Sequence, residues 1–291
     1  MPLLARLGDP AMTVPMLDRA GPVTADPGVL IDVLRYLATP APAPQRRLGY
    51  LRDSIWLQSR ARRCRAAWAP HLAASRAVIR EAIRTCERRD KAVVLGSGLL
   101  DDVPLDALTT NFRRVVLVDA VHPLATRRLV RDCPNIELLT ADLSGAMALM
   151  TGKAPDLDPR LPPVCADPET GLVISANLLS QLPIRPVARL EGSRRPIGTW
   201  TRDDGDAFGR RIVEGHLAAL AALPAKICLL TDLDEEETDR EGRVHARHDL
   251  LYGVRLAKPD RSWIWELAPV GEAARGRRLL HRVAGFWDWR A

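Results

Sequence analysis

Long hydrophobic runs are missing from this chain of 291 residues. No stretch of about 18 consecutive apolar residues occurs, and a helix needs roughly that length to cross a bilayer. Prolines and charged residues interrupt residues 1–23, which lack the continuous apolar segment of a signal peptide. We therefore expect a cytoplasmic protein that does not contact a membrane.

Metal-binding and disulfide patterns are also absent. The chain has an odd number of cysteines, and no two of them are close in sequence: Cys64, Cys86, Cys133, Cys165 and Cys228. This spacing favours buried free thiols in a reducing compartment over a disulfide framework or a zinc ribbon. His245 and His248 lie three residues apart without an evident third ligand, so we predict no metal site.

Positive charge is unevenly spread along the chain. The formal net charge is +6, but residues 46–91 hold 13 Arg and Lys against 4 Asp and Glu, a local balance of +9, so the remainder is mildly acidic. A basic segment of this kind either binds an acidic partner such as RNA or forms an arginine-rich helix exposed to solvent. Composition leaves both interpretations open.

The first 90 residues differ from the rest in composition and in the spacing of their apolar residues. Residues 1–45 are rich in proline, and we expect an irregular N-terminal arm with one apolar helix near residues 27–38. In residues 46–90 apolar side chains recur at steps of three and four, which predicts a basic helical cap, kinked or restarted at Pro70. Residues 91–291 then form the main domain.

Apolar runs alternate with helical stretches in this main domain. The runs that predict parallel strands are "KAVVLG", "RRVVLVDA", "NIELLTADL", "GLVISANLLSQLP" and "AKICLLTDLDEEE". Strands that are apolar throughout are covered by helices on both faces. Two aromatic runs near the C-terminus, "RSWIWELAP" and "HRVAGFWDWR", have no long helix between them and favour an antiparallel pair. We predict a doubly wound α/β fold, a mostly parallel seven-stranded sheet with this antiparallel pair and an N-terminal helical extension.

The first predicted strand ends in a glycine turn, Gly96-Ser97-Gly98, and ligands of such sheets bind beyond the carboxyl ends of the strands. Glycines let the backbone bend sharply and approach a ligand closely. A dinucleotide site would place a pyrophosphate on the next helix N-terminus, where Asp101 and Asp102 stand here. Two like unit charges about 4 Å apart repel by ~4 kcal/mol at an effective dielectric of 20. The turn therefore favours a ligand with a cationic group.

Four stretches, "VVLGSG", "VVLVDA", "LLTADLS" and "LVISANLLSQLP", resemble the class I S-adenosylmethionine-dependent methyltransferases, a Rossmann-like superfamily. This cofactor carries a sulfonium and an ammonium group. The resemblance implies that the glycine turn packs against its methionine part, and that Asp119, followed by Ala120, binds the ribose hydroxyls. It also implies that Asp142, followed by Leu143, faces the adenine amino group. Ser175 would line the methyl-transfer centre.

The chain departs from the family pattern at two positions. Val94 stands where an acidic residue usually precedes the first glycine by two positions, and Leu100 stands where a third glycine often falls. Asp101 or Asp102 is the candidate to replace the missing acid and bind the ammonium group. The departures leave open a domain that keeps the fold without binding the cofactor, in which the glycines and Asp142 only form turns.

Acceptor residues are expected after the fourth strand. Methyl transfer requires positioning above all, and sometimes a base. Asn177 and Gln181 are our candidate catalytic residues because their amides can orient a nucleophile; alternatively, Asn177 caps a turn and Gln181 is solvated. The insertion at residues 183–204 contains arginines and a tryptophan, which suit an acidic, planar substrate, although a disordered loop fits it too. For the acidic residues 232–239 we favour a solvated loop over a site for a cationic substrate.

These patterns predict S-adenosylmethionine-dependent methyl transfer to an unidentified acceptor, either a small molecule or an acidic substrate such as RNA. The second hypothesis is an inactive methyltransferase-like module that binds RNA or protein through its basic helices. A nicotinamide-dependent reductase is disfavoured by the two aspartates of the glycine turn. The sequence leaves the oligomeric state open.

Overall fold

The computed structural model describes residues 27–191 and 202–290. Its helices are α2 (Pro27–Ala38), α3 (Ala43–Arg47), α4 (Tyr50–Arg63), α5 (Arg65–Arg84), α6 (Leu105–Asn111), α7 (Leu124–Val130), α8 (Met147–Met150), α9 (Ile184–Glu191) and α10 (Arg202–Ala221), with a 3-10 turn η2 (Pro163–Cys165). Its strands are β1 (Lys91–Leu95), β2 (Arg114–Asp119), β3 (Ile136–Thr140), β4 (Thr170–Ala176), β5 (Lys226–Asp239), β6 (Val244–Asp249), β7 (Arg261–Ala268) and β8 (Arg277–Phe286).

All of these strands belong to one sheet, in the order β3-β2-β1-β4-β5-β8-β7, with β6 paired to β5. Strands β1 to β5 run parallel, whereas β8 is antiparallel to both β5 and β7. The predicted doubly wound α/β class, with its antiparallel C-terminal pair, is confirmed. The strand order reverses between β1 and β4, and ligands of open α/β sheets bind at such a switch point.

The predicted count of seven strands was wrong because β6 was missed. Residues 232–239 are no solvated loop, since β5 continues through them and forms a hairpin with β6. Their carboxylates are tolerated in a strand because arginines of the neighbouring strands pair with them. These pairs are Asp234–Arg282, Glu236–Arg247 and Glu237–Arg277.

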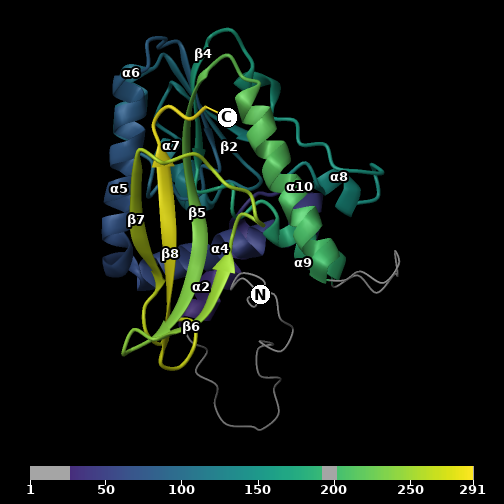
Figure 1. The fold of residues 1–291 in the computed structure, drawn as a ribbon. Helices are drawn as coiled ribbons and strands as arrows, with labels where there is room; N and C mark the ends of the chain where they lie inside the picture. The colour runs from purple at the N-terminus through teal and green to yellow at the C-terminus, as the bar shows by residue number, and fades with distance from the viewer. Residues whose placement is uncertain (1–26, 192–201, 291) are drawn as a thin grey trace.

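Helices cover both faces of the sheet. In β1, Val94 packs on the side of α5 and α6, while Val93 packs on the side of α10, as expected for strand side chains that alternate between faces. Figure 1 shows α5 and α10 on opposite sides of the sheet. The expected boundary at residue 90 therefore does not separate two packing units, because α5 belongs to the layer that covers the sheet.

The N-terminal helices differ from the prediction in two details. Within the expected irregular arm, α2 confirms the apolar helix, and α3 adds a short second one. The helix break falls at Cys64, between α4 and α5, and Pro70 lies inside α5. Tertiary packing holds the segment after the break in place, because the buried Trp68 indole donates to the Leu267 carbonyl at 3.0 Å. In the described part of the chain, no helix is long and apolar enough to span a membrane.

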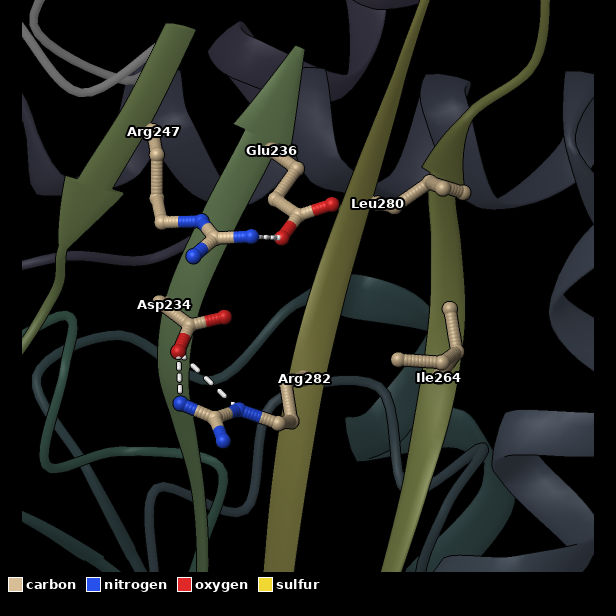
Figure 2. Close-up of a pocket in the computed structure, with 6 residues that line it drawn as sticks. All are labelled: Asp234, Glu236, Arg247, Ile264, Leu280 and Arg282. Atoms are coloured by element: carbon tan, nitrogen blue, oxygen red, sulfur yellow. Dashed lines mark hydrogen bonds and ion pairs between the residues drawn. The ribbon is translucent and has the colours of Figure 1, made fainter. Parts of the chain in front are cut away.

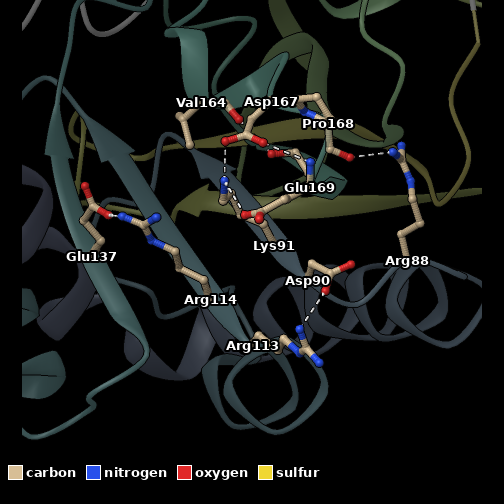
Figure 3. A network of polar contacts seen from close by, with 11 residues as sticks. Arg88, Asp90, Lys91, Arg113, Arg114, Glu137, Val164, Asp167, Pro168 and Glu169 are labelled. Atoms are coloured by element: carbon tan, nitrogen blue, oxygen red, sulfur yellow. Dashed lines mark hydrogen bonds and ion pairs between the residues drawn. The ribbon is translucent and has the colours of Figure 1, made fainter.

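A buried lysine organises the amino end of the sheet. The Lys91 side chain begins β1 and is only 2% exposed, and its ammonium pairs with the carboxylates of Asp167 and Glu169. Arg88 donates to the Pro168 carbonyl of the same segment at 2.9 Å. Figure 3 shows these contacts together. The segment that leads into β4 is thus attached to the first strand by charge, because a buried ammonium needs such partners.

Replacing Lys91 with methionine should lower the unfolding free energy by about 1–3 kcal/mol, because the buried ion pair is lost while the freed carboxylates can still be hydrated. Chemical denaturation at pH 7 measures this. Arg113→Met is the matched control, because its pair with Asp90 is exposed and should contribute less than about 0.5 kcal/mol. Equal losses in the two variants would contradict a structural role of Lys91.

Candidate functional site

The glycine turn bends over the carboxyl end of β1 in conformations that favour glycine. Gly96 and Gly98 have φ angles of 75° and 48°. A Cβ atom at Gly96 would lie 3.0 Å from the Leu178 Cβ, so a side chain has little room there. The hydroxyl of Ser97 is buried and finds no hydrogen-bond partner among the described residues. The turn thus combines close backbone approach with an unsatisfied polar group.

Asp119 reaches this turn from the end of β2. Its Oδ2 accepts a hydrogen bond from the Gly98 N–H at 2.7 Å, and its Oδ1 accepts a weaker one from the Val121 N–H at 3.4 Å. Desolvation raises the pKa of the Asp119 carboxyl, against the effect of these bonds. The structure brings Asp119, Ala120 and the glycine turn together at one edge of the sheet, as a ribose site requires. Their binding role stays a prediction.

The two aspartates after the turn differ in exposure and in their hydrogen-bond partners. Asp101 is exposed, and its carbonyl accepts a hydrogen bond from Arg76 of α5. Asp102 accepts a hydrogen bond at its Oδ2 from the Asn177 Nδ2 at 2.6 Å. Val94 is fully buried in the core. Of the two candidates for the missing acid, Asp102 is therefore the one held at the switch point.

Asn177 and Gln181, the two predicted catalytic residues, have different environments. Asn177 has a left-handed φ of 48°, and its N–H donates to the Leu230 carbonyl at 3.0 Å, which fixes it at the end of β4 beside β5. Its Oδ1 is buried without a donor in the described ranges. Gln181 is exposed to solvent. The structure thus brings Asn177 to the site and leaves Gln181 at the surface.

The Asp142 carboxylate accepts hydrogen bonds from residues that closely follow it in the chain. Its Oδ1 accepts hydrogen bonds from the Ser144 N–H at 2.9 Å and hydroxyl at 2.7 Å, and its Oδ2 accepts one from the Met147 N–H at 2.8 Å. This is the alternative in which Asp142 caps a turn. Leu143 packs into the core beside it.

Ser175 does not reach the rim of the sheet. It is fully buried, and its hydroxyl lies 3.2 Å from the Nε2 of His216 on α10. Burial lowers the pKa of His216 to about 4, so this imidazole stays neutral. The alternating pattern of β4 turns Ser175 toward the helix layer, and its role at the methyl-transfer centre stays a prediction.

An unpredicted cluster of buried and partly buried polar and aromatic residues lies beside the site, and we call it the His281 cluster. It consists of His71, Asp232, Glu235, Trp263, Trp265 and His281. His281 on β8 lies between two carboxylates, with its Nδ1 3.2 Å from the Asp232 Oδ2 and its Nε2 3.1 Å from the Glu235 Oε2. Burial alone would lower the pKa of His281, but the carboxylates outweigh it and raise the pKa to about 9.

His71 connects this cluster to helix α5. Its ring stacks on Trp265 with centroids 4.0 Å apart, and its Nδ1 accepts a hydrogen bond from the Trp263 indole at 3.1 Å. Burial lowers the pKa of His71, although the charges of Asp102 and Asp232 act in the opposite direction. The pairing of β5 with β8 brings these residues together from positions far apart in the chain. Nothing in the sequence indicated this cluster, because neither His71 nor His281 has another member of the cluster close to it along the chain.

The insertion at residues 183–204 is only partly described, since Arg194, Arg195 and Trp200 lie outside the described residues. Its first part is the helix α9, where Arg185 forms an ion pair with Asp53 of α4. This arginine attaches α9 to the N-terminal helices and is not available to an acidic substrate in this arrangement.

A hollow of about 450 Å³ lies along β5, β8 and the segment that follows β6, beside a smaller one of about 180 Å³. Figure 2 shows that charged residues of the smaller hollow pair with each other, Arg282 with Asp234 and Arg247 with Glu236. Paired charges leave little for a ligand to neutralise. We therefore place the candidate site at the glycine turn and not in these hollows.

The basic helices are also largely paired within the chain. Arg60 and Arg63 both contact Glu272, and Trp68 is core. On α4, Arg52 lies over the ring of the half-exposed Trp56, 5.1 Å from its centroid. Across the described ranges, no cluster of three or more His, Cys, Asp or Glu could hold a metal ion.

Comparisons with known proteins found no matching family model and no matching curated protein. Among solved structures, the chain is similar to the 1,6-didemethyltoxoflavin-N1-methyltransferase of Burkholderia thailandensis, with 15% identity, a TM-score of 0.36, and coverage of 85% of this chain and 92% of that chain. It is also similar to the N-methyltransferase NodS of Bradyrhizobium japonicum, with 11% identity, a TM-score of 0.35, and coverage of 89% and 98%. Likenesses this distant transfer no function.

The charge of His281 should make stability depend on pH. Its pKa is about 9 in the folded chain and ~6.5 in an unfolded one. The stabilisation is therefore complete below pH ~6.5 and is lost as the pH rises through ~9. We expect the stability advantage of wild type over His281→Gln to shrink by up to about 3 kcal/mol between pH 6 and pH 10. Denaturant unfolding measures this; parallel pH curves for the two proteins would exclude a charged His281.

Proposed function

We propose that this chain transfers a methyl group from S-adenosylmethionine to an acceptor. The observation that carries the proposal is the hydrogen bond between the Gly98 N–H and the Asp119 carboxylate, which joins the ends of β1 and β2 next to the switch point of the sheet. It places the Asp119 carboxylate next to the glycine turn, whose backbone a ligand can approach closely. A ligand with a ribose and a cationic end requires such an arrangement. A pyrophosphate would meet the charges of Asp102 and Asp119 instead.

The residues at and near the glycine turn would each contact a different part of this cofactor. Gly96 and Gly98 would lie against the methionine part, and Asp119 would accept from the ribose hydroxyls. Asp102 would bind the ammonium group in place of the acid that Val94 lacks. Asp142, whose carboxylate already serves three donors, would shape the adenine side by holding its own turn.

S-adenosylmethionine supplies an electrophilic methyl carbon when it is bound. The chain's own contribution is to position the acceptor and to handle its proton. Asn177 would orient the acceptor, because its amide is fixed by a backbone hydrogen bond and by Asp102. The acceptor would be a small molecule or an acidic substrate such as RNA.

Titration calorimetry with S-adenosylhomocysteine tests the cofactor site. We expect a dissociation constant in the micromolar range, and Asp119→Ala should weaken binding about 10- to 100-fold, because a charged hydrogen bond contributes ~1.5–3 kcal/mol. Asp106→Ala on α6 is the control, because this exposed carboxylate pairs with Arg80 at the surface. A folded protein that gives no binding heat would falsify the proposal.

The alternative of a binding module without catalysis has one observation in its favour, the cation–π pair of Arg52 and the half-exposed Trp56 on α4. Exposed aromatic and arginine side chains bind single-stranded nucleic acid by stacking. Binding of a single-stranded RNA that falls steeply with salt, together with no affinity for S-adenosylhomocysteine, would favour this alternative.

A further inference from the structure

Besides the Ser97 hydroxyl of the glycine turn, two buried oxygen atoms beside the proposed cofactor site lack a hydrogen-bond donor in the part of the chain that the structure describes. They are the Asn177 Oδ1 and the Asp232 Oδ1. Their residues are only 8% and 2% exposed. Leaving a buried acceptor unsatisfied costs ~1–3 kcal/mol, so such atoms are rare and need an explanation. A ligand that brings donors is one.

One acceptor follows the end of β4, and the other lies within the neighbouring strand β5. Asn177 follows β4 and binds through its N–H to the Leu230 carbonyl of β5, two residues before Asp232. The Ser180 hydroxyl, from the turn after β4, lies 3.4 Å from the Asp232 Oδ2. Both acceptors therefore lie near the level at which β4 ends, where ligands of such sheets bind, with Asp232 in the part of β5 that continues beyond β4.

The other polar atom of each side chain already has a contact. The Nδ2 of Asn177 donates to Asp102, and the Oδ2 of Asp232 faces His281. Because these contacts fix both side chains, the free oxygens keep one orientation without a ligand. Such preorganisation is what a binding site needs, since little conformational entropy is lost when the ligand arrives.

The charge of the surroundings selects the ligand. The carboxylates of Asp232 and Glu235 flank one imidazolium, that of His281, and the carboxylate of Asp102 contacts Asn177. The formal balance is negative, and an anion or a bare carbonyl group would find no complement here. A group with several N–H donors would satisfy both free oxygens and offset the charge.

We propose that Asn177 and Asp232 form the subsite for the methyl acceptor and that this acceptor is an amine. The inference rests on the proposed function. The amine nitrogen gives one proton to the Asp232 Oδ1, and its electron pair forms the new C–N bond. The C–S bond of the sulfonium breaks with its electron pair left on sulfur. The positive charge of the sulfonium and the negative charge of Asp232 disappear together, so the step is balanced.

His281 acts in this scheme as a positioning residue. It holds the Oδ2 of Asp232 and leaves the Oδ1 directed to the ligand, while Glu235 binds the other ring nitrogen of His281. Trp265 lies with its edge against the same imidazole, at a centroid distance of 5.7 Å, and limits its rotation.

A matched pair of small probes tests the subsite. With the protein saturated with S-adenosylhomocysteine, calorimetry and amide chemical shifts at pH 7.5 would compare benzylamine with benzyl alcohol. We expect wild type to bind benzylamine at least about 10-fold more tightly, as a charge-assisted hydrogen bond implies. Asp232→Asn should reduce this preference to less than about 2-fold. Asp234→Asn, on the same strand but paired with Arg282, should retain it.

A second variant guards against a folding defect in Asp232→Asn. Asn177→Gly keeps the left-handed backbone and removes the Oδ1 acceptor, and it should lower the preference about 3- to 10-fold. Equal binding of amine and alcohol by wild type would overturn the inference, as would a preference that survives in both variants. If S-adenosylhomocysteine binds but the amine preference is missing, only the subsite fails. If the preference is present without S-adenosylhomocysteine binding, the proposed function fails and the amine site stands.

Discussion

The hydrogen bond between the Gly98 N–H and the Asp119 carboxylate is the contact on which the candidate site depends. It connects the ends of two parallel strands, together with the hydrogen bonds that the Gly96 and Ser97 N–H groups donate to the Val118 carbonyl. Thr126 of α7 supports the same glycine by donating to its carbonyl at 2.8 Å. Because the turn is held from both sides, the positive φ angles of its glycines are fixed before any ligand binds.

A register shift between Asp232 and Asp234 governs the other half of the site. In a regular strand, residues three apart point to opposite faces. The shift places Asp232 and Glu235 on the same side, where both meet His281. A local irregularity of one strand therefore produces the charge arrangement that distinguishes this chain.

Local patterns in the sequence predicted the sheet and the glycine turn well, because apolar runs and glycines act over a few residues. They also predicted that Asp119 and Asn177 lie at the carboxyl edge of the parallel strands. They could not show that Ser175 faces the helix layer, or that Asp142 serves its own turn, because both depend on side-chain direction. The continuation of β5 was missed because its carboxylates are neutralised by arginines of β8 and β6, which are distant in sequence.

The hairpin of β5 and β6 and the body of the sheet are stabilised by different forces. Ion pairs line the hairpin, whereas the strands β1, β2 and β4 are buried among apolar side chains. Salt screens exposed ion pairs, and temperature changes the strength of apolar burial. The hairpin therefore responds to salt concentration, and the parallel strands respond to temperature. A rise in ionic strength can loosen the hairpin while the parallel strands stay folded.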